Sequence, residues 1–403
     1  MGKENNIRGI DIILLLYVIS VFVFSTDDTL YRYSNYAFLV FAASTFLWRG
    51  LRCGWKISYY GLKEYIPFFF LTIVSIPFAL NNSLSLEICR TEFLLIIMVI
   101  MVYNCYVNDG NIEWILISFL VGGTLVSLQV ISEYGINGVF SGLLGGNRVG
   151  NDLFQLNYLG RFSYWAALIA MYYAFVKRKV LCYVIFAVNV LVCIGSGSRQ
   201  AWIALVICLL ILVLSLNGGN LKARKYLATL LFVCAAYIVV TNPAFDAVLQ
   251  RLNSGLASFF NSTAGTRSDQ IRVEMIRVGW NTFIHNPIIG VGYGNVAEIA
   301  TGMIQNYGYL HNNYLELLAC GGILGFVAYY VMYILLFKRL SQVIKSKSQY
   351  ENLARFATIL LIGQLIMDMF AVSYYSKHQF LIFAFSSLVV YRNQYAMNKG
   401  EER

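Results

Sequence analysis

Residues 311–325 read His-Asn-Asn-Tyr-Leu-Glu-Leu-Leu-Ala-Cys-Gly-Gly-Ile-Leu-Gly, and they open an apolar segment that continues to about residue 337. A histidine and two asparagines therefore stand where a predicted membrane helix begins. Directly before them lies the longest stretch of the chain that is not strongly apolar, from about Thr241 to Leu310. We interpret this junction between a large loop and a membrane helix as the candidate site for chemistry at a membrane surface.

The composition predicts an integral membrane protein. The chain has 403 residues, of which 59% are hydrophobic and only 12% are charged. A soluble domain cannot bury that much apolar surface, so we predict an all-α, polytopic membrane protein. The net charge of +10 could indicate nucleic-acid binding, but the basic residues form short clusters between apolar runs. That pattern is typical of membrane topology, and we expect no nucleic-acid partner.

Apolar runs that can cross a bilayer, or nearly so, recur along the whole chain. Their spacing predicts about twelve transmembrane helices, some of which borrow flanking polar residues to reach full length. Pro67 and Pro77 fall in the third run, where we expect them to kink the helix. The runs lie at about 10–24, 36–48, 65–80, 93–107, 112–131, 157–176, 180–194, 201–216, 226–241, 313–337, 354–372 and 378–391.

Basic clusters indicate the orientation of these helices. Lys177–Lys179 and the cluster from Lys338 to Lys347 fall on the same side as both termini, whereas the other side carries isolated arginines. Positive clusters mark the cytoplasmic side, so we predict a multi-pass protein of the inner (cytoplasmic) membrane with both termini in the cytoplasm. The predicted regions are residues 1–241 with spans one to nine, 242–312 as a large external loop, and 313–403 with spans ten to twelve and a cytoplasmic tail.

The external loop contains two helical patterns. Apolar residues recur at helical spacing over 245–260, as in a helix that lies on the membrane surface. Over 267–281, polar residues recur at steps of three and four, which predicts an amphipathic helix that ends at Asn286-Pro287. The following run, Gly290-Val-Gly-Tyr-Gly294, comes after a helix and lacks a lysine, so it is not a nucleotide-binding loop.

Four arginines on the predicted outer side are candidate ligands for a phosphate group. A single arginine in such a place is explained by snorkelling to headgroups, or by an ion pair with an acid such as Glu87 or Glu92. Several arginines on one face without matching acids favour a site for a phosphate or diphosphate. These candidates are Arg90, Arg148, Arg199 and Arg267.

The histidines differ in their sequence context. His285 precedes Asn-Pro at a helix end, which favours a structural role, and His378 starts the last run, which favours capping or an interfacial position. His311 lies within a turn of a helix start, where the helix dipole disfavours the imidazolium. A neutral imidazole is what a general base needs, so His311 is the candidate catalytic residue.

The chain lacks the patterns that bind metals. The outer acidic residues form no Asp-x-Asp motif, and the histidines have no ligand spacing. The eight cysteines lie mostly in apolar runs without a Cys-x-x-Cys pair, so we interpret them as small buried residues. We predict a metal-independent activity that uses no cofactor, with arginines in the place of a magnesium ion.

Several motifs together resemble the O-antigen polymerase and O-antigen ligase superfamily. The match is densest over about 190–335, and the predicted twelve-span layout with a large outer loop between spans nine and ten extends it to the whole chain. A weaker segment, Arg148-Val-Gly150 with Asn157, is also similar. The main motifs are Ser196-Gly-Ser-Arg-Gln-Ala-Trp202, Gly265-Thr-Arg-Ser268, Trp280-x4-His-Asn-Pro-x2-Gly-Val-Gly-x-Gly294 and His311-Asn-x2-Leu-x5-Gly321.

The resemblance implies a GT-C-like membrane glycosyltransferase whose donor is a glycan on undecaprenyl diphosphate at the outer leaflet. Arg199 and Arg267 would hold the diphosphate, with Arg148 as a further ligand and Asn312 and Asn157 in supporting roles. Arg90, proposed from its position before a membrane helix, is a fourth candidate ligand. His311 would assist attack by the acceptor hydroxyl. A flippase and a chain-length regulator are the partner proteins that such an enzyme implies, beside the lipid bilayer itself.

Three functions fit this pattern to different degrees. The ligase pattern has an arginine soon after a membrane aspartate, whereas Asp368 here is followed only by Lys377. We therefore expect a repeat-unit polymerase, with a ligase that transfers the finished glycan to another acceptor as the alternative. A transporter of the same lipid-linked sugars is a third reading, but internal repeats are absent and Asp368 is the only clear mid-span acid.

Overall fold

The computed structural model describes residues 7–24, 30–59, 64–144, 149, 155–215, 226, 267–303 and 309–399. Within these ranges the secondary structure is helical, as the composition predicted, and contains no strand. The helices are α1 Gly9–Val23, α2 Tyr31–Cys53, α3 Ile66–Ser75, η2 Ile76–Phe78, α4 Asn82–Tyr106, α5 Glu113–Leu144, α6 Leu156–Val176, α7 Leu181–Gly195, α8 Arg199–Ser215, α11 Arg267–His285, α12 Val296–Met303, α13 Asn313–Ser346, α14 Glu351–Asp368 and α15 Lys377–Lys399.

Each predicted apolar run overlaps a described helix, except that the ninth run, at 226–241, lies almost wholly outside the described residues. Some helices extend well beyond their runs, such as α4, which begins at Asn82 where the run begins at about 93, and α11 and α12 fall in the predicted loop. Within the described part, two helical segments are long and apolar enough to cross a membrane by length and composition, Glu113–Val139 and Asn313–Ser346. Four further apolar helices are shorter, at 10 to 17 residues. The all-helical, membrane-type fold is therefore supported, and the count of about twelve spans remains a prediction.

The prolines of the third run act differently from the expected kinks. Pro67 lies in the first turn of α3, where a missing N–H costs nothing. Pro77 lies in η2, a 3-10 turn that follows α3 directly. The run is therefore a short helix with a tightened last turn.

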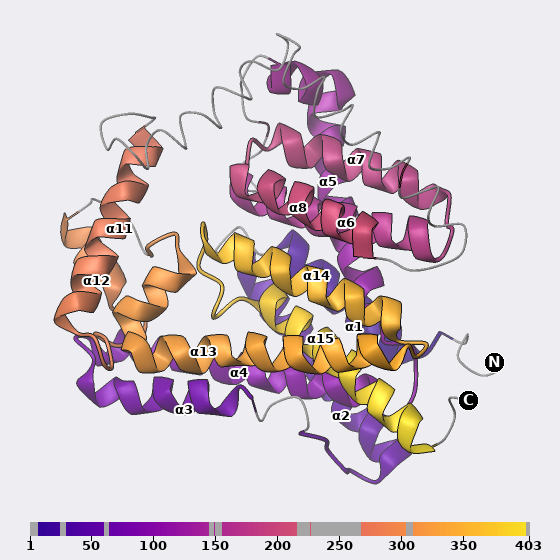
Figure 1. Ribbon diagram of the computed structural model, residues 1–403, viewed down its shortest axis with the longest axis horizontal. Helices are drawn as coiled ribbons and strands as arrows, with labels where there is room; N and C mark the ends of the chain where they lie inside the picture. Colours follow the sequence, from indigo (N-terminus) through magenta and orange to yellow (C-terminus); the bar gives the residue numbers. More distant parts are fainter. Residues whose placement is uncertain are drawn as a thin grey trace.

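The helices pack in two neighbouring groups (Figure 1). In one group α5, α6 and α7 pack on one another, and α8 packs on α6 and α14. In the other, the long helix α13 runs beside α3, α14 and α15, and α15 packs on α4. The loop helices α11 and α12 lie together at one end of the molecule, against α13.

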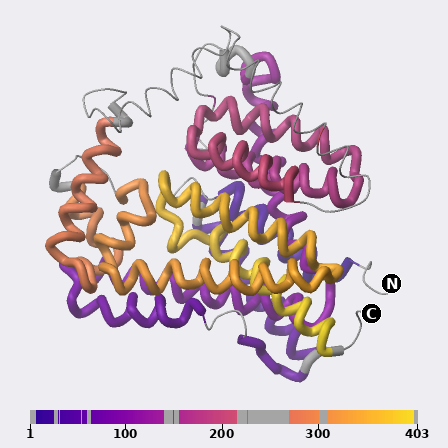
Figure 2. The backbone as a smooth tube through the Cα atoms, in the orientation of Figure 1, coloured from indigo at the N-terminus to yellow at the C-terminus, as the bar shows by residue number. Residues whose placement is uncertain are grey.

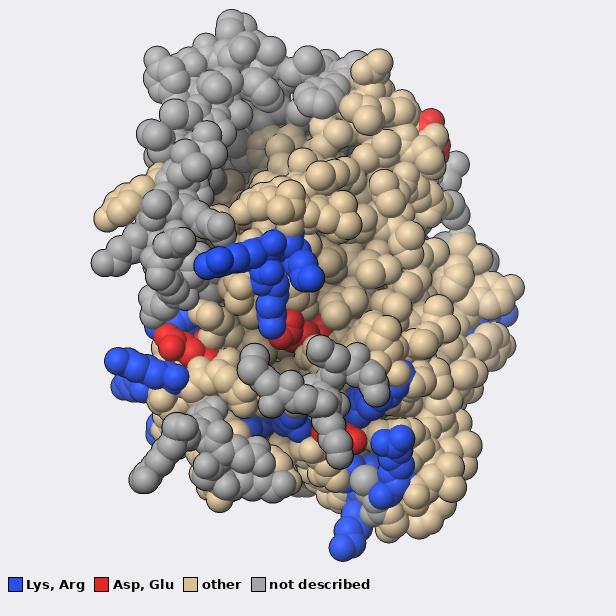
Figure 3. Space-filling model, turned by 90° about the vertical axis from the view of Figure 1, so that its right-hand side faces the viewer, with Lys and Arg blue, Asp and Glu red and all other residues tan. Residues whose placement is uncertain are grey.

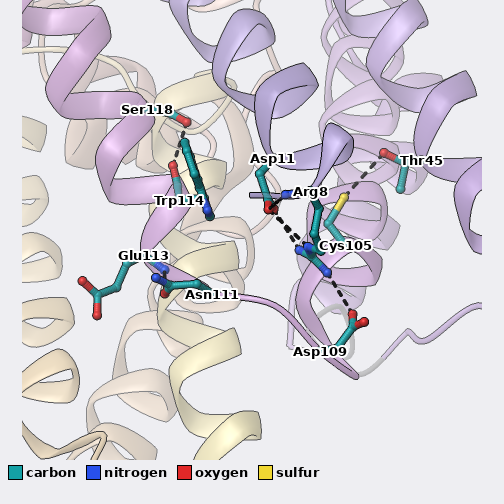
Figure 4. Close-up of polar contacts among 9 residues, drawn as sticks. All are labelled: Arg8, Asp11, Thr45, Cys105, Asp109, Asn111, Glu113, Trp114 and Ser118. Atoms are coloured by element: carbon teal, nitrogen blue, oxygen red, sulfur yellow. Dashed lines mark hydrogen bonds and ion pairs between the residues drawn. The ribbon is translucent and has the colours of Figure 1, made fainter. Parts of the chain in front are cut away.

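The two chain ends lie at the opposite end of the molecule from α11 and α12 (Figure 2). Polar contacts join the elements that meet there. Figure 4 shows Arg8 between two acids, with 2.9 Å from its guanidinium nitrogens to both Asp11 and Asp109. Lys177 Nζ lies 2.8 Å from Glu113 Oε1, which joins the end of α6 to the start of α5. Figure 3 views this end directly and shows lysines and arginines gathered on it, with few acids between them.

This basic end is where the sequence predicted the cytoplasmic side. If the prediction is correct, cysteines placed at Ser83 and Ser346 in a cysteine-free variant react from opposite sides with a membrane-impermeant maleimide. Ser83 is exposed in the first turn of α4, and Ser346 is exposed at the end of α13. We expect labelling of intact spheroplasts at position 83 only, with position 346 reacting after permeabilisation. Labelling of both positions from outside would overturn the topology.

Candidate functional site at the start of α13

Helix α13 begins at a side-chain cap. Asn312 is the N-cap residue in an extended conformation, and its Oδ1 accepts a hydrogen bond from the backbone N–H of Leu315 at 3.1 Å. This bond satisfies one of the N–H groups that a helix start leaves without a partner. The structure therefore gives Asn312, predicted as a supporting residue, a defined positioning role directly beside His311.

The turn before the cap is held in an unusual conformation. His311 has φ +54°, in the left-handed region that residues other than glycine seldom adopt. Its ring lies 4.2 Å from the ring of Tyr309, centroid to centroid, and the two planes are tilted by 58°. Between them, the N–H of the buried Leu310 donates to Glu316 Oε2 at 2.8 Å. These contacts hold the backbone of His311 in a strained conformation, a feature that is common at functional residues.

The surroundings of His311 keep its ring neutral. Burial lowers the pKa of His311 from 6.5 to about 4, and the positive charge of Arg272 in α11 lowers the pKa in the same direction. Both effects favour the neutral imidazole that the sequence argument expects. The sequence argument named the helix dipole as its cause, whereas the structure points to burial first and to Arg272 second.

Arg161 is a second arginine beside this turn, and sequence reasoning missed it. It lies in α6, is only 6% exposed, and its guanidinium carbon lies 5.4 Å from the ring centroid of Tyr158. Burial raises the pKa of Tyr309 to about 12 and Tyr158 adds to this shift, whereas Arg161 and Arg272 oppose it. Tyr309, whose ring contacts that of His311 at a tilt, is therefore near both arginines. The one sequence signal was an arginine inside the apolar run 157–176.

Arg199 is the first residue of α8, directly after the turn Ser196-Gly-Ser198. This turn packs so closely on Gly160 of α6 that a Cβ at Gly160 would collide with Ser198 and Ser196. Gly160 directly precedes Arg161 in α6. The packing therefore places the turn before Arg199 next to the part of α6 that contains Arg161.

The other residues that the sequence predicted as ligands or supporting residues do not all lie near His311. Arg148 and the side chain of Arg267 lie outside the described residues. Asn157 is half-buried in the first turn of α6, four residues before Arg161. Arg90 is exposed in α4 and, within the described part of the chain, it pairs with neither Glu87 nor Glu92, in contrast to the ion pair considered from sequence. Arg90 belongs to a separate cavity that is described below.

Asn313, the second asparagine of the motif, connects α13 to the turn between α14 and α15. Its Oδ1 accepts hydrogen bonds from the backbone N–H groups of Ser373 at 2.9 Å and Tyr374 at 3.1 Å. Asn313 is completely buried, so a side chain without these donors would leave two amide groups unsatisfied. The sequence indicated a functional junction here, but it did not show that this asparagine fixes the neighbouring turn.

Asp368 bonds to the same turn as Asn313, through Ser373. It is the last residue of α14 and is completely buried, whereas the sequence analysis expected a mid-span acid, a depth in the membrane that stays a prediction. Its carboxylate accepts from Gln364 Nε2 at 3.0 Å, from Ser373 Oγ at 2.5 Å and from Tyr330 Oη at 3.3 Å. These neutral donors explain how the chain accommodates a buried acid without an arginine nearby in sequence.

The glycine run 290–294 packs against the backbone of α13, near residues 319–322. Helix α13 is interrupted at Gly322, which has φ +60°. The N–H groups of Val291 and Gly292 donate to the carbonyls of Ala319 and Cys320, at 3.0 and 2.9 Å. A Cβ at Gly290 or Gly322 would collide with the facing backbone, so glycine is required at both. The run is a backbone junction that holds the first segment of α13.

The other two histidines are not part of this site. His285 is exposed at the end of α11, and its Nδ1 lies 2.8 Å from the Asn281 carbonyl oxygen, which fits the structural role expected for it. His378 lies at the start of α15, in agreement with the sequence expectation, and it is buried. Its ring lies 4.8 Å from Phe22, 5.0 Å from Phe162 and 5.1 Å from Trp165. Within the described residues, no group of three or more His, Cys, Asp or Glu side chains could hold a metal ion.

Within the described residues the secondary structure is helical and includes two segments long and apolar enough to cross a membrane, which is typical of an integral membrane protein. Residues 184–330 match the model of a protein family described as O-antigen ligase. The match covers the segment that carries α7, α8, α11, α12 and the start of α13, and it supports the resemblance to the O-antigen polymerase and ligase superfamily. No curated protein matches the sequence.

Proposed function

We propose that the protein is a polymerase of lipid-linked oligosaccharide repeat units, acting at the outer face of the cytoplasmic membrane. The observation that carries this proposal is the half-buried His311 in a strained turn at the start of α13, where burial and the charge of Arg272 both lower the pKa of its ring. A base and a fixed cation next to each other are what glycosyl transfer from a diphosphate donor requires. The family match supports an activity of the polymerase or ligase type without separating the two.

The proposed reaction is a displacement at the anomeric carbon of the donor. The acceptor hydroxyl oxygen forms a bond to this carbon, and the bond from the carbon to the diphosphate oxygen breaks. The electron pair leaves with undecaprenyl diphosphate, and the hydroxyl proton passes to the imidazole of His311. Diphosphate is already a good leaving group, so the protein has to stabilise negative charge more than it has to supply an acid.

Arg272 is the best-placed residue for the diphosphate, because it is close enough to His311 to lower its pKa. Arg161, near Tyr309, and Arg199, at the turn packed on α6, extend the positive charge around the same turn. A guanidinium binds two phosphate oxygens at once, which suits this task. Arg267 and Arg148 remain predicted ligands from the outer loops.

A ligase is the second candidate, and the description of the matching family favours it. In that reading the same base and arginines act, but the acceptor is a different lipid or glycan. The sequence after Asp368 favours the polymerase, because the ligase pattern has an arginine soon after the aspartate and the nearest basic residue here is Lys377. A repeat-unit flippase and a chain-length regulator are the partners that a polymerase would need.

Elongation by the purified protein tests the proposal. Protein in nanodiscs, supplied only with an undecaprenyl-diphosphate-linked repeat unit, should produce a ladder of longer lipid-linked glycans. Formation of a single product only after a lipid A core acceptor is added would identify a ligase instead.

The same assay tests metal independence. We expect elongation to continue at an unchanged rate in excess EDTA, because arginines supply the charge that a bound magnesium ion would otherwise supply. Loss of elongation in EDTA that magnesium or manganese restores would show that the arginine argument is wrong.

A further inference from the structure

A cavity of about 280 Å³ lies apart from His311, between α1, α2, α4 and the start of α15. None of its lining residues is among those that surround the His311 turn. Two cations, Arg90 and Lys377, and one acid, Glu87, line it, so its formal charge is +2 − 1 = +1. Its remaining wall is largely apolar and includes Phe38, Leu94 and Leu95.

The two cations are held in different ways. Lys377 Nζ donates to Ser34 Oγ and to Asn35 Oδ1, both at 2.9 Å, which fixes the ammonium at one side of the cavity. Arg90 is exposed and forms no ion pair within the described part of the chain, although Glu87 is one turn away in the same helix. A fixed ammonium and an uncommitted guanidinium suit a ligand that carries more than one phosphate charge.

The apolar wall indicates that this ligand is a lipid. Leu94 lines the cavity and is 40% exposed, and Phe38, Leu95 and Met98 complete the apolar wall. In a membrane helix an exposed leucine faces acyl chains, so this wall is suited to an apolar tail. A headgroup with phosphates and an apolar tail fits both parts.

The cavity is connected to the candidate site through one short segment. Asn313, two residues after His311, accepts hydrogen bonds from Ser373 and Tyr374, and Lys377 follows three residues later. Three residues span at most about 11 Å. The cavity therefore lies at the same end of the molecule as His311 but does not share its residues.

We propose that this cavity binds the diphosphate and the first isoprene units of the acceptor, a second lipid-linked repeat unit. The inference rests on the proposed polymerase function. The donor diphosphate leaves from the reacting carbon, so it must lie beside His311. The acceptor instead attacks with a hydroxyl of its far sugar, so its own diphosphate lies one repeat unit away from the base. A polymerase thus needs two diphosphate sites separated by a glycan, and the Arg90–Lys377 cavity has the position and chemistry of the second.

The kinetic test uses the double variant Arg90→Gln, Lys377→Gln in full-length protein. Glutamine at 377 can still donate to Asn35 and Ser34, and position 90 is exposed, so folding is preserved. With a labelled long-chain donor and a single-repeat acceptor, we expect the acceptor KM to rise about tenfold or more, because two charge-assisted contacts are lost. The donor KM and kcat should stay within about twofold, as in the control Arg277→Gln, which removes an exposed arginine of α11. An unchanged acceptor KM, or a change in donor KM instead, would overturn the inference.

Lipid retention tests the cavity independently of activity. Native mass spectrometry of protein given undecaprenyl diphosphate should show two bound lipids for the unmodified protein and one for the double variant. One lipid in both proteins would overturn the second site. Loss of phosphatidylglycerol to the same extent would identify a site for bulk phospholipid and would overturn it as well. If elongation fails while the two-to-one change in retention is found, the proposed polymerase function is wrong and the diphosphate site remains.

Discussion

His311→Ala is expected to lower the elongation rate by ~10²–10⁴, which is the usual contribution of a general base. The variant should insert and fold normally, because His311 lies before α13 and the cap bond from Leu315 to Asn312 does not involve its side chain. The measurement is the initial rate of glycan elongation by purified protein at saturating donor. Bound donor should be retained, since His311 acts on the acceptor hydroxyl.

Two further variants define the role of the ring. His311→Gln can hydrogen-bond an acceptor sugar but cannot take its proton, so we expect it to be nearly as inactive as alanine. His285→Ala is the matched control, because His285 is exposed at the end of α11 and contacts only backbone within the described residues. His378→Ala is unsuitable as a control, since removing a ring packed on Phe22 and Trp165 costs stability. A glutamine variant with most of its activity would show that His311 positions the acceptor and that another group is the base.

The pH profile gives an independent signature of His311. Its pKa is lowered from 6.5 to about 4, so the neutral ring persists as the pH falls below 6.5 and is lost only near pH 4. The profile of kcat/KM, which reports the free enzyme, should therefore remain flat through the ordinary histidine range. The profile of kcat should bend at higher pH, because a bound diphosphate offsets the charge of Arg272 and raises the pKa of His311 in the complex.

The helices were predictable from sequence because each apolar run had to satisfy its own backbone in the membrane. Helix α6, at Leu156–Val176, agrees closely with the expected run at 157–176, whereas α4 begins at Asn82, well before the run expected at 93–107. The roles of Pro67 and Pro77 were not predictable in the same way. A proline kinks a helix only when it lies inside it, and here the helix begins at one proline and tightens at the other.

The site was predictable in part, for a different reason. His311 and Asn312 stand at a helix start that the sequence alone defines, and the local cap follows from that position. Arg161 and Arg272 become neighbours of Tyr309 only when α6 and α11 are packed around the turn. Spacing within one helix cannot show that two helices meet. The sequence analysis therefore selected arginines that lie in recognisable motifs and did not select Arg161 and Arg272, which tertiary packing brings near His311. For the same reason the sequence could not show that Asn313 accepts hydrogen bonds from the backbone N–H groups of Ser373 and Tyr374.

Arg272→Lys is expected to reduce elongation by ~10²–10³, although it keeps the positive charge. An ammonium binds a diphosphate as a point charge, whereas a guanidinium binds two oxygens in fixed geometry, so geometry is what the variant loses. Donor KM should rise together with the loss of kcat, because the same contact holds the diphosphate in the ground state and in the transition state. The measurement is a two-substrate kinetic analysis of the purified variant beside Arg277→Lys, which changes an exposed arginine on the same helix.

Arg272→Gln separates the two effects of this residue. Removing the charge eliminates one of the two causes that lower the pKa of His311, so the bend in kcat/KM should move upward from about pH 4, whereas in Arg272→Lys it should stay in place. Arg272→Gln and Arg272→Lys should both be nearly inactive, because neither side chain can form the bidentate contact to the diphosphate that a guanidinium forms. Near-normal turnover in Arg272→Lys with its pH profile unchanged would show that Arg272 acts only through its charge on His311. The diphosphate would then have to be held by Arg161, Arg199 or the outer-loop arginines, each of which the same lysine substitution tests.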